Sequence, residues 1–418
     1  MERIGCSNTI SWDVISHLTI NMVNFLMKLN ETIKSLRKAN GNKTAAESTL
    51  TNITDYFDTG SMALNRVITG DVNKGFPSGR ISCIFGPSQS GKSLIAAQTV
   101  ANAFKQNKID VCYWVDSEGG GAQILENFGV DLERVEYIPV ADVEEATVSL
   151  VKIYDTLAQA HKEWEDDPKN NDRIRAIVVL DSFGGLASSK MISDAVDKDK
   201  MVPDMGAAAK GRNALMRALM MRVVKADAAL IIINHEYQNP GAMFTSKIHS
   251  MAGGLGIEYA SHVILQASKL LVKDGDTEFA TGKESDGNHV GFYKGNRMRF
   301  FCTKNRVIKP AFEADVYIDF DTGISKYDGI IKDAVAYGFI QEVRGGYVVP
   351  TYKDTRVTYK ELVANDEIWD TFLDKFNEES AKRMSYTSRS DEAINEIENE
   401  IKNKQLIVED SNNADIEA

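Results

Sequence analysis

Five short apolar runs divide the middle of the chain, and none of them alternates with polar residues. They read ISCIF from residue 81, VCYWV from 111, AIVVLD from 176, ALIIIN from 229 and HVILQA from 262. A strand that is apolar at every position is buried on both faces, as happens in a parallel sheet covered by helices. Strands and helices alternate from about residue 59 to 330. The pattern predicts an α/β fold with a doubly wound, mainly parallel sheet.

The flanking segments have other patterns. RMRFFCTKNR from residue 297 and FEADVYIDF from 312 alternate more, and we expect them to pair antiparallel. Near the N-terminus, steps of three and four between apolar residues predict an amphipathic helix over 12–37, followed by a polar linker. This helix packs either on its own domain or on a neighbouring subunit. Its apolar positions are Trp12, Ile15, Leu18, Met22, Phe25, Leu29, Ile33 and Leu36.

We therefore expect four regions. Residues 1–54 form an N-terminal helix and linker for subunit contact, 55–327 the α/β core, 328–384 a small C-terminal α/β appendage, and 385–418 an acidic, flexible tail. The 4 cysteines are scattered without metal spacing, and Cys83 and Cys112 fall in expected core strands, which fits a reducing cytoplasm. No apolar run is long enough to cross a membrane, and the N-terminus lacks a secretory pattern.

The stretch GPSQSGKS, which begins at Gly86, follows one apolar run and precedes a helical pattern. It matches the phosphate-binding loop G-x-x-x-x-G-K-[ST], and a glycine-rich turn without a ligand is the alternative. In such a loop, backbone N–H groups hold phosphates, the lysine reaches the β- and γ-phosphates, and the last hydroxyl is a Mg²⁺ ligand. The sequence thus predicts an ATP and Mg²⁺ site made by Gly86, Pro87, Ser88, Gln89, Ser90, Gly91, Lys92, Ser93 and Leu94.

Polar residues follow three other predicted strands. Asp181 ends VVLD and is the expected second Mg²⁺ group, although an Asp there can also cap a turn. In YWVDSEGG, Asp116 and Glu118 are both candidates for activating a water, and we favour Glu118 because the glycines after it start a loop. His235 follows LIIIN, where it either senses the γ-phosphate or is an ordinary buried polar residue. These features predict an ATP hydrolase but leave kinases, helicases, transporter motors and recombinases open.

The flanks narrow that choice. TGSMALNRVITGDVNKGFPSGRISCIFGPSQSGKS strongly resembles the entry into the ATPase core of RecA-type recombinases. VDSEGG, VVLDSFGGLASSK, INHEYQNPGAMF, MAGGLGIEYASHVI and TKNRVIKP follow in the family's order. The combination is most similar to the UvsX-like recombinases of T-even-type bacteriophages, and it covers roughly residues 55–345. The resemblance implies helical filaments on single-stranded DNA that pair it with homologous duplex, with ATP hydrolysed between adjacent subunits.

The resemblance also assigns roles to residues. Glu118 stands where the family keeps its water-activating carboxylate, and His235 where it keeps the γ-phosphate sensor. Lys304 and Arg306 match a cation pair that reaches the ATP of the neighbouring subunit, and Phe320 an aromatic residue against adenine. Residues 183–205 and 236–254 match the two DNA-binding loops. The DNA-binding residues implied in and beside these loops are Lys190, Met205, Lys210, Arg212, Arg217, Phe244, Lys247, Gly253 and Gly254.

The charge is uneven in a way that bears on DNA. The formal net charge is -12, but Lys200 to Lys225 holds 6 basic residues and one acid, whereas 385–418 holds 3 basic and 9 acidic residues. A DNA-binding strip and a solvated helix face both explain the basic segment. The alternative function is a hexameric helicase-type motor with the same core. For a recombinase we expect a single-strand-binding protein and a loading mediator as further partners, and cytoplasmic action, in the host cell if the chain is phage-encoded.

Overall fold

The computed structural model describes most of the chain. The described residues are 28–39, 52–198, 205–238, 249–270, 280–283, 289–293, 295–319, 322–353 and 355–386. The chain separates into two compact units, Met1–Ile53 and Thr54–Ala418. The first unit is described over one helix, residues 28–39, which overlaps the end of the helix predicted for 12–37. Within this unit the side chains of Leu29 and Leu36 are 43% and 56% exposed, so their apolar surface is uncovered there.

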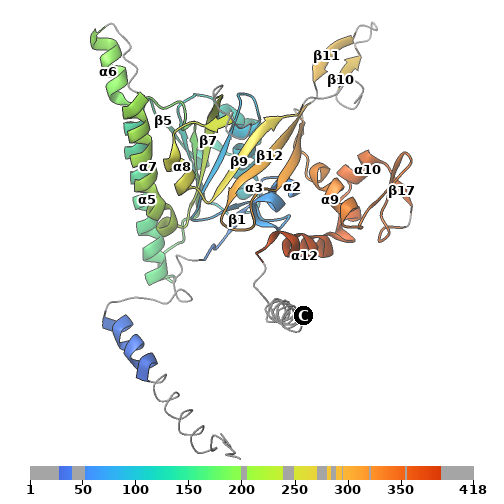
Figure 1. Cartoon of the computed structure of the whole chain (residues 1–418), viewed down its shortest axis with the longest axis horizontal. Coiled ribbons are helices and arrows are strands. Elements are labelled where there is room, and N and C mark those ends of the chain that lie inside the picture. Colours follow the sequence, from blue (N-terminus) through green and yellow to red (C-terminus); the bar gives the residue numbers. More distant parts are fainter. Residues whose placement is uncertain are drawn as a thin grey trace, which may run out of the picture. The chain divides into compact units, whose positions relative to one another are not determined.

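The second unit is built on one large sheet (Figure 1). Its strands lie in the order β14-β13-β12-β9-β3-β7-β6-β4-β5, and β8 pairs with β7. Every pair from β9 to β5 along this order is parallel, as the apolar runs predicted. The strands are β3 (Ile81–Gly86), β4 (Val111–Asp116), β5 (Val135–Pro139), β6 (Ala176–Asp181), β7 (Ala229–Gln238), β8 (His249–Met251), β9 (Val263–Lys269), β12 (Gly295–Asn305), β13 (Glu313–Asp319) and β14 (Gly323–Ile324).

Helices cover both faces of the sheet. Alternate residues of a single strand enter two separate cores: Ile177 and Val179 of β6 belong to one core, and Val178 and Leu180 to the other. This is why the strands are apolar at every position. The first core contains residues of α2 (Met62–Thr69), α3 (Lys92–Lys105) and α4 (Gly121–Asn127), and the second those of α5 (Val143–Asp166), α7 (Met205–Ala226) and α8 (Leu255–Ala260).

The antiparallel part of the sheet is confirmed as predicted. β12 pairs antiparallel with both β9 and β13. Beyond it, the C-terminal region shares the first core, and Tyr327 stacks on Trp369 with ring centroids 4.8 Å apart. Its elements are η5 (Asp328–Ile330), α9 (Ile331–Ala336), β15 (Gln341–Val343), β16 (Gly346–Val348), β17 (Arg356–Val357), α10 (Tyr359–Ala364), α11 (Asp366–Asp370) and α12 (Leu373–Met384).

Smaller elements complete the described part of the chain. A helix, α6, lies within the predicted first DNA-binding loop. A hairpin of β10 and β11 follows β9 and precedes β12 in the chain (Figure 1). Of the tail predicted for 385–418, residues 387–418 lie outside the described residues. These elements are β1 (Tyr56–Phe57), β2 (Phe76–Pro77), η2 (Leu132–Arg134), α6 (Ser189–Lys198), β10 (Ala280–Lys283) and β11 (His289–Tyr293).

Candidate active site

The strand register brings the predicted chemical groups to one edge of the sheet. Gly86 lies beside His235 across β3 and β7, and Asp116 beside Asp181 across β4 and β6. Because these strands are parallel, the residues that follow their carboxyl ends gather at the same edge, where ligands bind in open α/β sheets.

The phosphate-loop motif forms the connection from β3 to α3. Gly91 is the N-cap of α3 and has a φ of 73°, a left-handed conformation that glycine adopts without strain. A Cβ at Gly91 would lie 2.6 Å from Ile318 Cδ1, so a side chain there would also collide with β13. The loop therefore requires glycine at this position for both reasons, and its shape leaves the N-terminus of a 14-residue helix open to an anion.

Lys92 is folded back onto the loop. Its ammonium donates hydrogen bonds to the carbonyl oxygens of Pro87 at 2.7 Å and Gly86 at 3.1 Å. Burial lowers the pKa of Lys92, and the nearby carboxylates of Asp181 and Glu118 oppose that shift. A partly desolvated cation whose hydrogen bonds go to neutral oxygens gains from a directly bonded anionic partner, and a phosphate would provide one.

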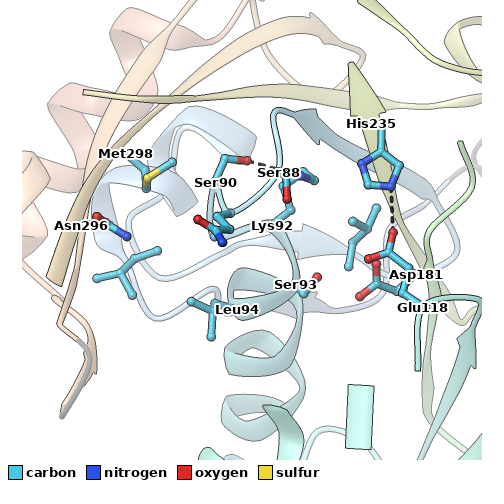
Figure 2. Close-up of a pocket in the computed structure, with 14 residues that line it drawn as sticks. Ser88, Ser90, Lys92, Ser93, Leu94, Glu118, Asp181, His235, Asn296 and Met298 are labelled. Carbon is cyan, nitrogen blue, oxygen red and sulfur yellow. Dashed lines mark hydrogen bonds and ion pairs between the residues drawn. The ribbon is translucent and has the colours of Figure 1, made fainter. Parts of the chain in front are cut away.

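A cavity of about 360 Å³ opens beside the loop (Figure 2). It brings together most of the residues that the sequence predicted for the ATP and Mg²⁺ site, from four different elements or their ends. The sequence did not predict the wall away from His235, which Asn296 and Met298 of β12 and Ile318 of β13 supply, or Ile233 of β7, which pairs with Asp181. No sequence motif identifies these residues. Those of β12 and β13 reach the cavity because β12 pairs with β9 and β13. The lining residues are Ser88, Gln89, Ser90, Gly91, Lys92, Ser93, Leu94, Glu118, Asp181, Ile233, His235, Asn296, Met298 and Ile318.

The two candidate carboxylates after β4 have different surroundings. Asp116 is buried, and its oxygens accept hydrogen bonds from the backbone N–H groups of Glu118, Gly119 and Gly121 and from the Tyr137 hydroxyl, at 2.7–2.9 Å. Glu118 instead lines the cavity, and its Oε1 lies 2.7 Å from His235 Nε2 (Figure 2). Asp116 is thus occupied in shaping the loop that presents Glu118.

Asp181 combines burial with an unused oxygen. Its side chain is 5% exposed, and its Oδ1 has no hydrogen-bond partner among the described residues. Burial raises the pKa of Asp181 to about 6, the charges of Glu118 and Asp116 add to that, and a hydrogen bond with Ser93 opposes it. A buried carboxylate beside a hydroxyl provides the hard oxygen donors that Mg²⁺ takes. The residues present therefore fit the predicted Mg²⁺ ion.

These two oxygens would hold only part of a Mg²⁺ shell. Within the described ranges, no cluster of three or more His, Cys, Asp or Glu side chains could hold a metal ion. Mg²⁺ in nucleotide sites typically takes one or two protein oxygens and completes its shell with phosphate oxygens and waters. The donor set is therefore that of an ion that binds with a nucleotide.

Lys304 and Arg306 lie at the opposite edge of the sheet from the phosphate loop. Asn305 pairs with Val263, the first residue of β9, and the loop follows the other end of the neighbouring strand β3. The ammonium of Lys304 donates to the carbonyl oxygens of Glu258 and Tyr259 at 2.5 and 3.3 Å, and Arg306 donates to that of Tyr259 at 3.0 Å. The pair therefore caps the C-terminal end of α8 in its own subunit.

The predicted DNA-binding residues are spread over α6, α7 and the start of α8. Lys190 lies on α6, and Met205 is the first residue of α7. Lys210 and Arg217 are exposed on α7. Arg212 differs: it is half-buried, donates to the Leu186 carbonyl oxygen at 2.8 Å, and has a pKa lowered by burial.

Gly253 and Gly254 have φ angles of 100° and 75°, and a Cβ at Gly253 would lie 2.4 Å from the Phe183 ring. Their chain path therefore favours glycine and brings the second predicted loop against the first. Phe244 and Lys247, predicted to bind DNA, and Phe320, predicted at the adenine, lie outside the described residues.

The fold and this edge define a nucleotide-binding protein of the phosphate-loop class. The RecA N-terminal domain family model matches residues 27–325. The chain therefore belongs to the RecA N-terminal domain family. It is 28% identical over 338 residues to the recombination and repair protein of Enterobacteria phage T4, covering 80% of this chain and 77% of that protein.

Bacterial relatives match over a similar span. The chain is 28% identical over 305 residues to Protein RecA of Aquifex aeolicus, covering 72% of this chain and 74% of the relative. It is 27% identical over 358 residues to Protein RecA of a Wolbachia species, covering 85% and 87%. In the part of the chain that the structure covers, no helix has the length and apolarity needed to cross a membrane.

Proposed function

We propose that this chain is a RecA-type recombinase: a DNA-dependent ATPase that forms helical filaments on single-stranded DNA and exchanges strands with homologous duplex. The family membership and the likeness to a phage recombination and repair protein support the class. The observation that carries the proposal is the cavity in which Lys92, Ser93, Asp181, Glu118 and His235 meet. The ring-forming helicase motor has no comparable support among these relatives.

The side chains in the cavity have separate tasks in this proposal. Lys92 moves from the loop carbonyls to the β- and γ-phosphates of ATP. Ser93 and Asp181 hold Mg²⁺, which would offset phosphate charge when bound. Glu118 takes a proton from the attacking water, and His235 contacts the γ-phosphate. Asp116 keeps the Glu118 loop in place through its backbone hydrogen bonds.

A second copy of the chain completes the site. Lys304 and Arg306 lie about one strand length from the phosphate loop of their own subunit, because they stand at the opposite edge of the sheet. In the proposal they enter the cavity of the next subunit and offset charge in the transition state, as an arginine finger does. Helical filaments arise from such head-to-tail interfaces, since each copy both gives and receives the pair.

In this proposal DNA binds along the exposed surface of α7. The exposed basic residues of α7 contact phosphates, and residues 183–205 and 236–254 contact the stretched strand, with Met205 and Phe244 between groups of bases. Residues 1–54 contact the neighbouring subunit. A single-strand-binding protein and a loading mediator assist assembly. Action in the cytoplasm, of a host cell if the chain is phage-encoded, is part of the same proposal.

Phosphate release tests the proposal with and without single-stranded DNA. We expect the parent protein to hydrolyse ATP faster when single-stranded DNA is present. Lys92→Ala should abolish this turnover, because the phosphates lose their buried cation. Lys309→Ala is a matched control, since Lys309 donates to the Arg383 carbonyl oxygen far along the chain from the loop. DNA-stimulated turnover by Lys92→Ala at the parent rate would contradict the assigned site.

A further inference from the structure

Two polar side chains, Glu118 and Ser182, contact the same ring nitrogen of His235. His235 Nε2 lies 2.7 Å from Glu118 Oε1 and 3.0 Å from Ser182 Oγ. The dashed line that starts at His235 in Figure 2 marks the first of these two contacts. Glu118 and His235 already have roles in the proposed function, whereas Ser182 has none.

Ser182 is fixed where it stands. It is the first residue after β6 and its side chain is 0% exposed. Its backbone N–H donates to Ser117 Oγ at 3.0 Å, and the Ser117 hydroxyl donates to its carbonyl oxygen at 3.1 Å. The backbone N–H of Ser117 donates in turn to the Asp181 carbonyl oxygen at 2.7 Å. The backbone of Ser182 is therefore held by Ser117, the residue after β4, and its buried hydroxyl lies within hydrogen-bond distance of His235 Nε2.

One nitrogen of a neutral imidazole either donates or accepts a hydrogen bond, but it does not do both. If Nε2 carries the proton, it donates to the Glu118 carboxylate, and Ser182 is left with a weak, shared contact. If Nδ1 carries the proton, Nε2 accepts from the Ser182 hydroxyl and has no hydrogen to donate to the ionised Glu118. The change between these states moves one proton within the ring and leaves the total number of protons unchanged.

We propose that Ser182 is a positioning residue for hydrolysis, and that its hydroxyl competes with Glu118 for His235 Nε2. The inference rests on the proposed function, because it concerns the same water-activating carboxylate. A Glu118 carboxylate that is hydrogen-bonded to His235 is withheld from water. A hydrogen bond donated by the Ser182 hydroxyl to Nε2 stabilises the tautomer that is protonated at Nδ1. Glu118 is then free to accept a proton from water. Ser182 thus acts on the base through His235, without contact to the reacting atoms.

The tautomer of His235 gives a readout that does not depend on turnover. The chain has 6 histidines, so the ¹⁵N ring signals of histidine-labelled, nucleotide-free protein can be separated, and His235→Gln assigns the signal. The ¹⁵N shifts distinguish neutral from doubly protonated rings, and the tautomer ratio is taken from the neutral-ring signals at about pH 8. We expect Ser182→Ala to raise the fraction of His235 protonated at Nε2. Parent-like His235 signals in Ser182→Ala would overturn the proposal.

Matched variants separate this role from a structural one. Ser261→Ala also removes a fully buried hydroxyl, one that donates to the Ile257 carbonyl oxygen at 2.8 Å, so it should leave the His235 signals unchanged. Ser182→Thr keeps the hydroxyl and should retain the parent tautomer ratio. Ser182→Cys keeps nearly the same volume with a weak donor, so it should act like Ser182→Ala and replaces it if that variant does not fold. If Ser182→Thr gave the same His235 signals as Ser182→Ala, that result would overturn the proposal.

Steady-state kinetics provide the second readout. With saturating single-stranded DNA, Ser182→Ala should lower kcat about five- to tenfold, the effect expected when one hydrogen bond is lost, and leave KM for ATP within about twofold. A raised KM with unchanged kcat, or an unchanged kcat, would overturn the inference. The turnover of the parent protein distinguishes a failure of the recombinase proposal from a failure of the Ser182 proposal. A parent without DNA-stimulated turnover contradicts the recombinase, whereas an active parent with an equally active Ser182→Ala contradicts only the role of Ser182.

Discussion

Two carboxylates two residues apart, Asp116 and Glu118, have different tasks because they touch different groups. Asp116 accepts three backbone hydrogen bonds and one from Tyr137, which leaves its oxygens without capacity for a water. Glu118 lines the cavity and bonds to His235. The sequence favoured Glu118 because of the glycines after it, and the hydrogen bonds of Asp116 support the same choice for a separate reason.

Substitution of each carboxylate by its amide tests this difference. We expect Glu118→Gln to keep ATP and DNA binding and to lower turnover about 10²–10⁴-fold, the range for a general base, leaving long-lived filaments. Asp116→Asn should instead lower the free energy of unfolding, because an amide cannot accept all four hydrogen bonds. Phosphate release and chemical unfolding measure the two effects. Loss of hydrolysis in a stable Asp116→Asn, with an active Glu118→Gln, would reverse the assignment.

Burial of Asp181 makes the nucleotide-free protein sensitive to pH. Its folded-state pKa is raised from 3.8 to about 6, so the folded protein binds the proton more tightly than the unfolded chain does. The stabilisation is complete below pH 3.8 and is lost as the pH rises through about 6.

Asp181→Asn should therefore stabilise the nucleotide-free protein at neutral pH by roughly 1–3 kcal/mol and have little effect near pH 4. Urea unfolding of parent and variant in a chelator, across a pH series, measures this difference. The same variant should lose the added stability that Mg²⁺ and ATP give the parent. An Asn variant less stable than the parent at every pH would show that the ionised carboxylate is satisfied without a ligand.

Among the elements, α8 links the second predicted DNA-binding loop to the Lys304 and Arg306 pair. The helix begins directly after Gly253 and Gly254, and its last carbonyl oxygens accept hydrogen bonds from Lys304 and Arg306. Two cations at a helix C-terminus stabilise it, since they complement the partial negative charge there. If the pair moves to the γ-phosphate of the next subunit, α8 loses this cap, so the nucleotide of one subunit would affect the loop of another.

Mixing experiments test whether the pair acts across subunits. Lys304→Ala and Arg306→Ala should each lower turnover about 10³-fold or more. Mixed with Glu118→Gln, either variant should regain activity, because about a quarter of the interfaces at equal mixing have both groups intact. Lys309→Ala mixed with Glu118→Gln gives the control for simple dilution. Absence of recovery at every ratio would mean that the pair acts in its own subunit.

The sequence predicted those elements whose pattern depends on nearby residues. The apolar runs of β6 and β7 reveal two-sided burial directly, and the loop from Gly86 to Ser93 is continuous in sequence. The cavity wall from β12 and β13, and the helix α6 within the first predicted DNA-binding loop, were not predicted. The wall depends on register across β9, β12 and β13, which no local spacing encodes. The shared nitrogen of His235 likewise requires three strand ends to meet.

For the whole molecule, the overall charge is negative, and the basic residues that we propose to contact DNA form a local surface. The protein carries -12 overall, yet Lys210, Arg217 and Lys225 are exposed along α7. Residues 385–418 have three times as many acidic as basic side chains. We propose that this tail competes with DNA for the basic surface. Exposed charges interact only within about 10 Å at 0.1 M salt, so the competition requires the tail to reach that surface.

Deletion of residues 385–418 tests this competition. We expect stronger duplex binding over a wider range of salt concentrations, with turnover on single-stranded DNA little changed, because a polyanionic competitor has been removed. Duplex affinity of both forms across a salt series measures the effect, which should be largest at low salt. A tail with scrambled sequence and the same charge should behave as the parent. Superimposed curves at low salt would leave the tail with a role in solubility alone.

Strand exchange between circular single-stranded DNA and homologous linear duplex tests the recombinase most directly. With ATP and Mg²⁺, the parent protein should produce nicked circular duplex and a displaced linear strand, and heterologous duplex should yield neither product. Lys92→Ala should yield none with either duplex. A parent protein that hydrolyses ATP on DNA and unwinds duplex as a closed ring, without forming joint molecules, would contradict the recombinase and favour the helicase motor.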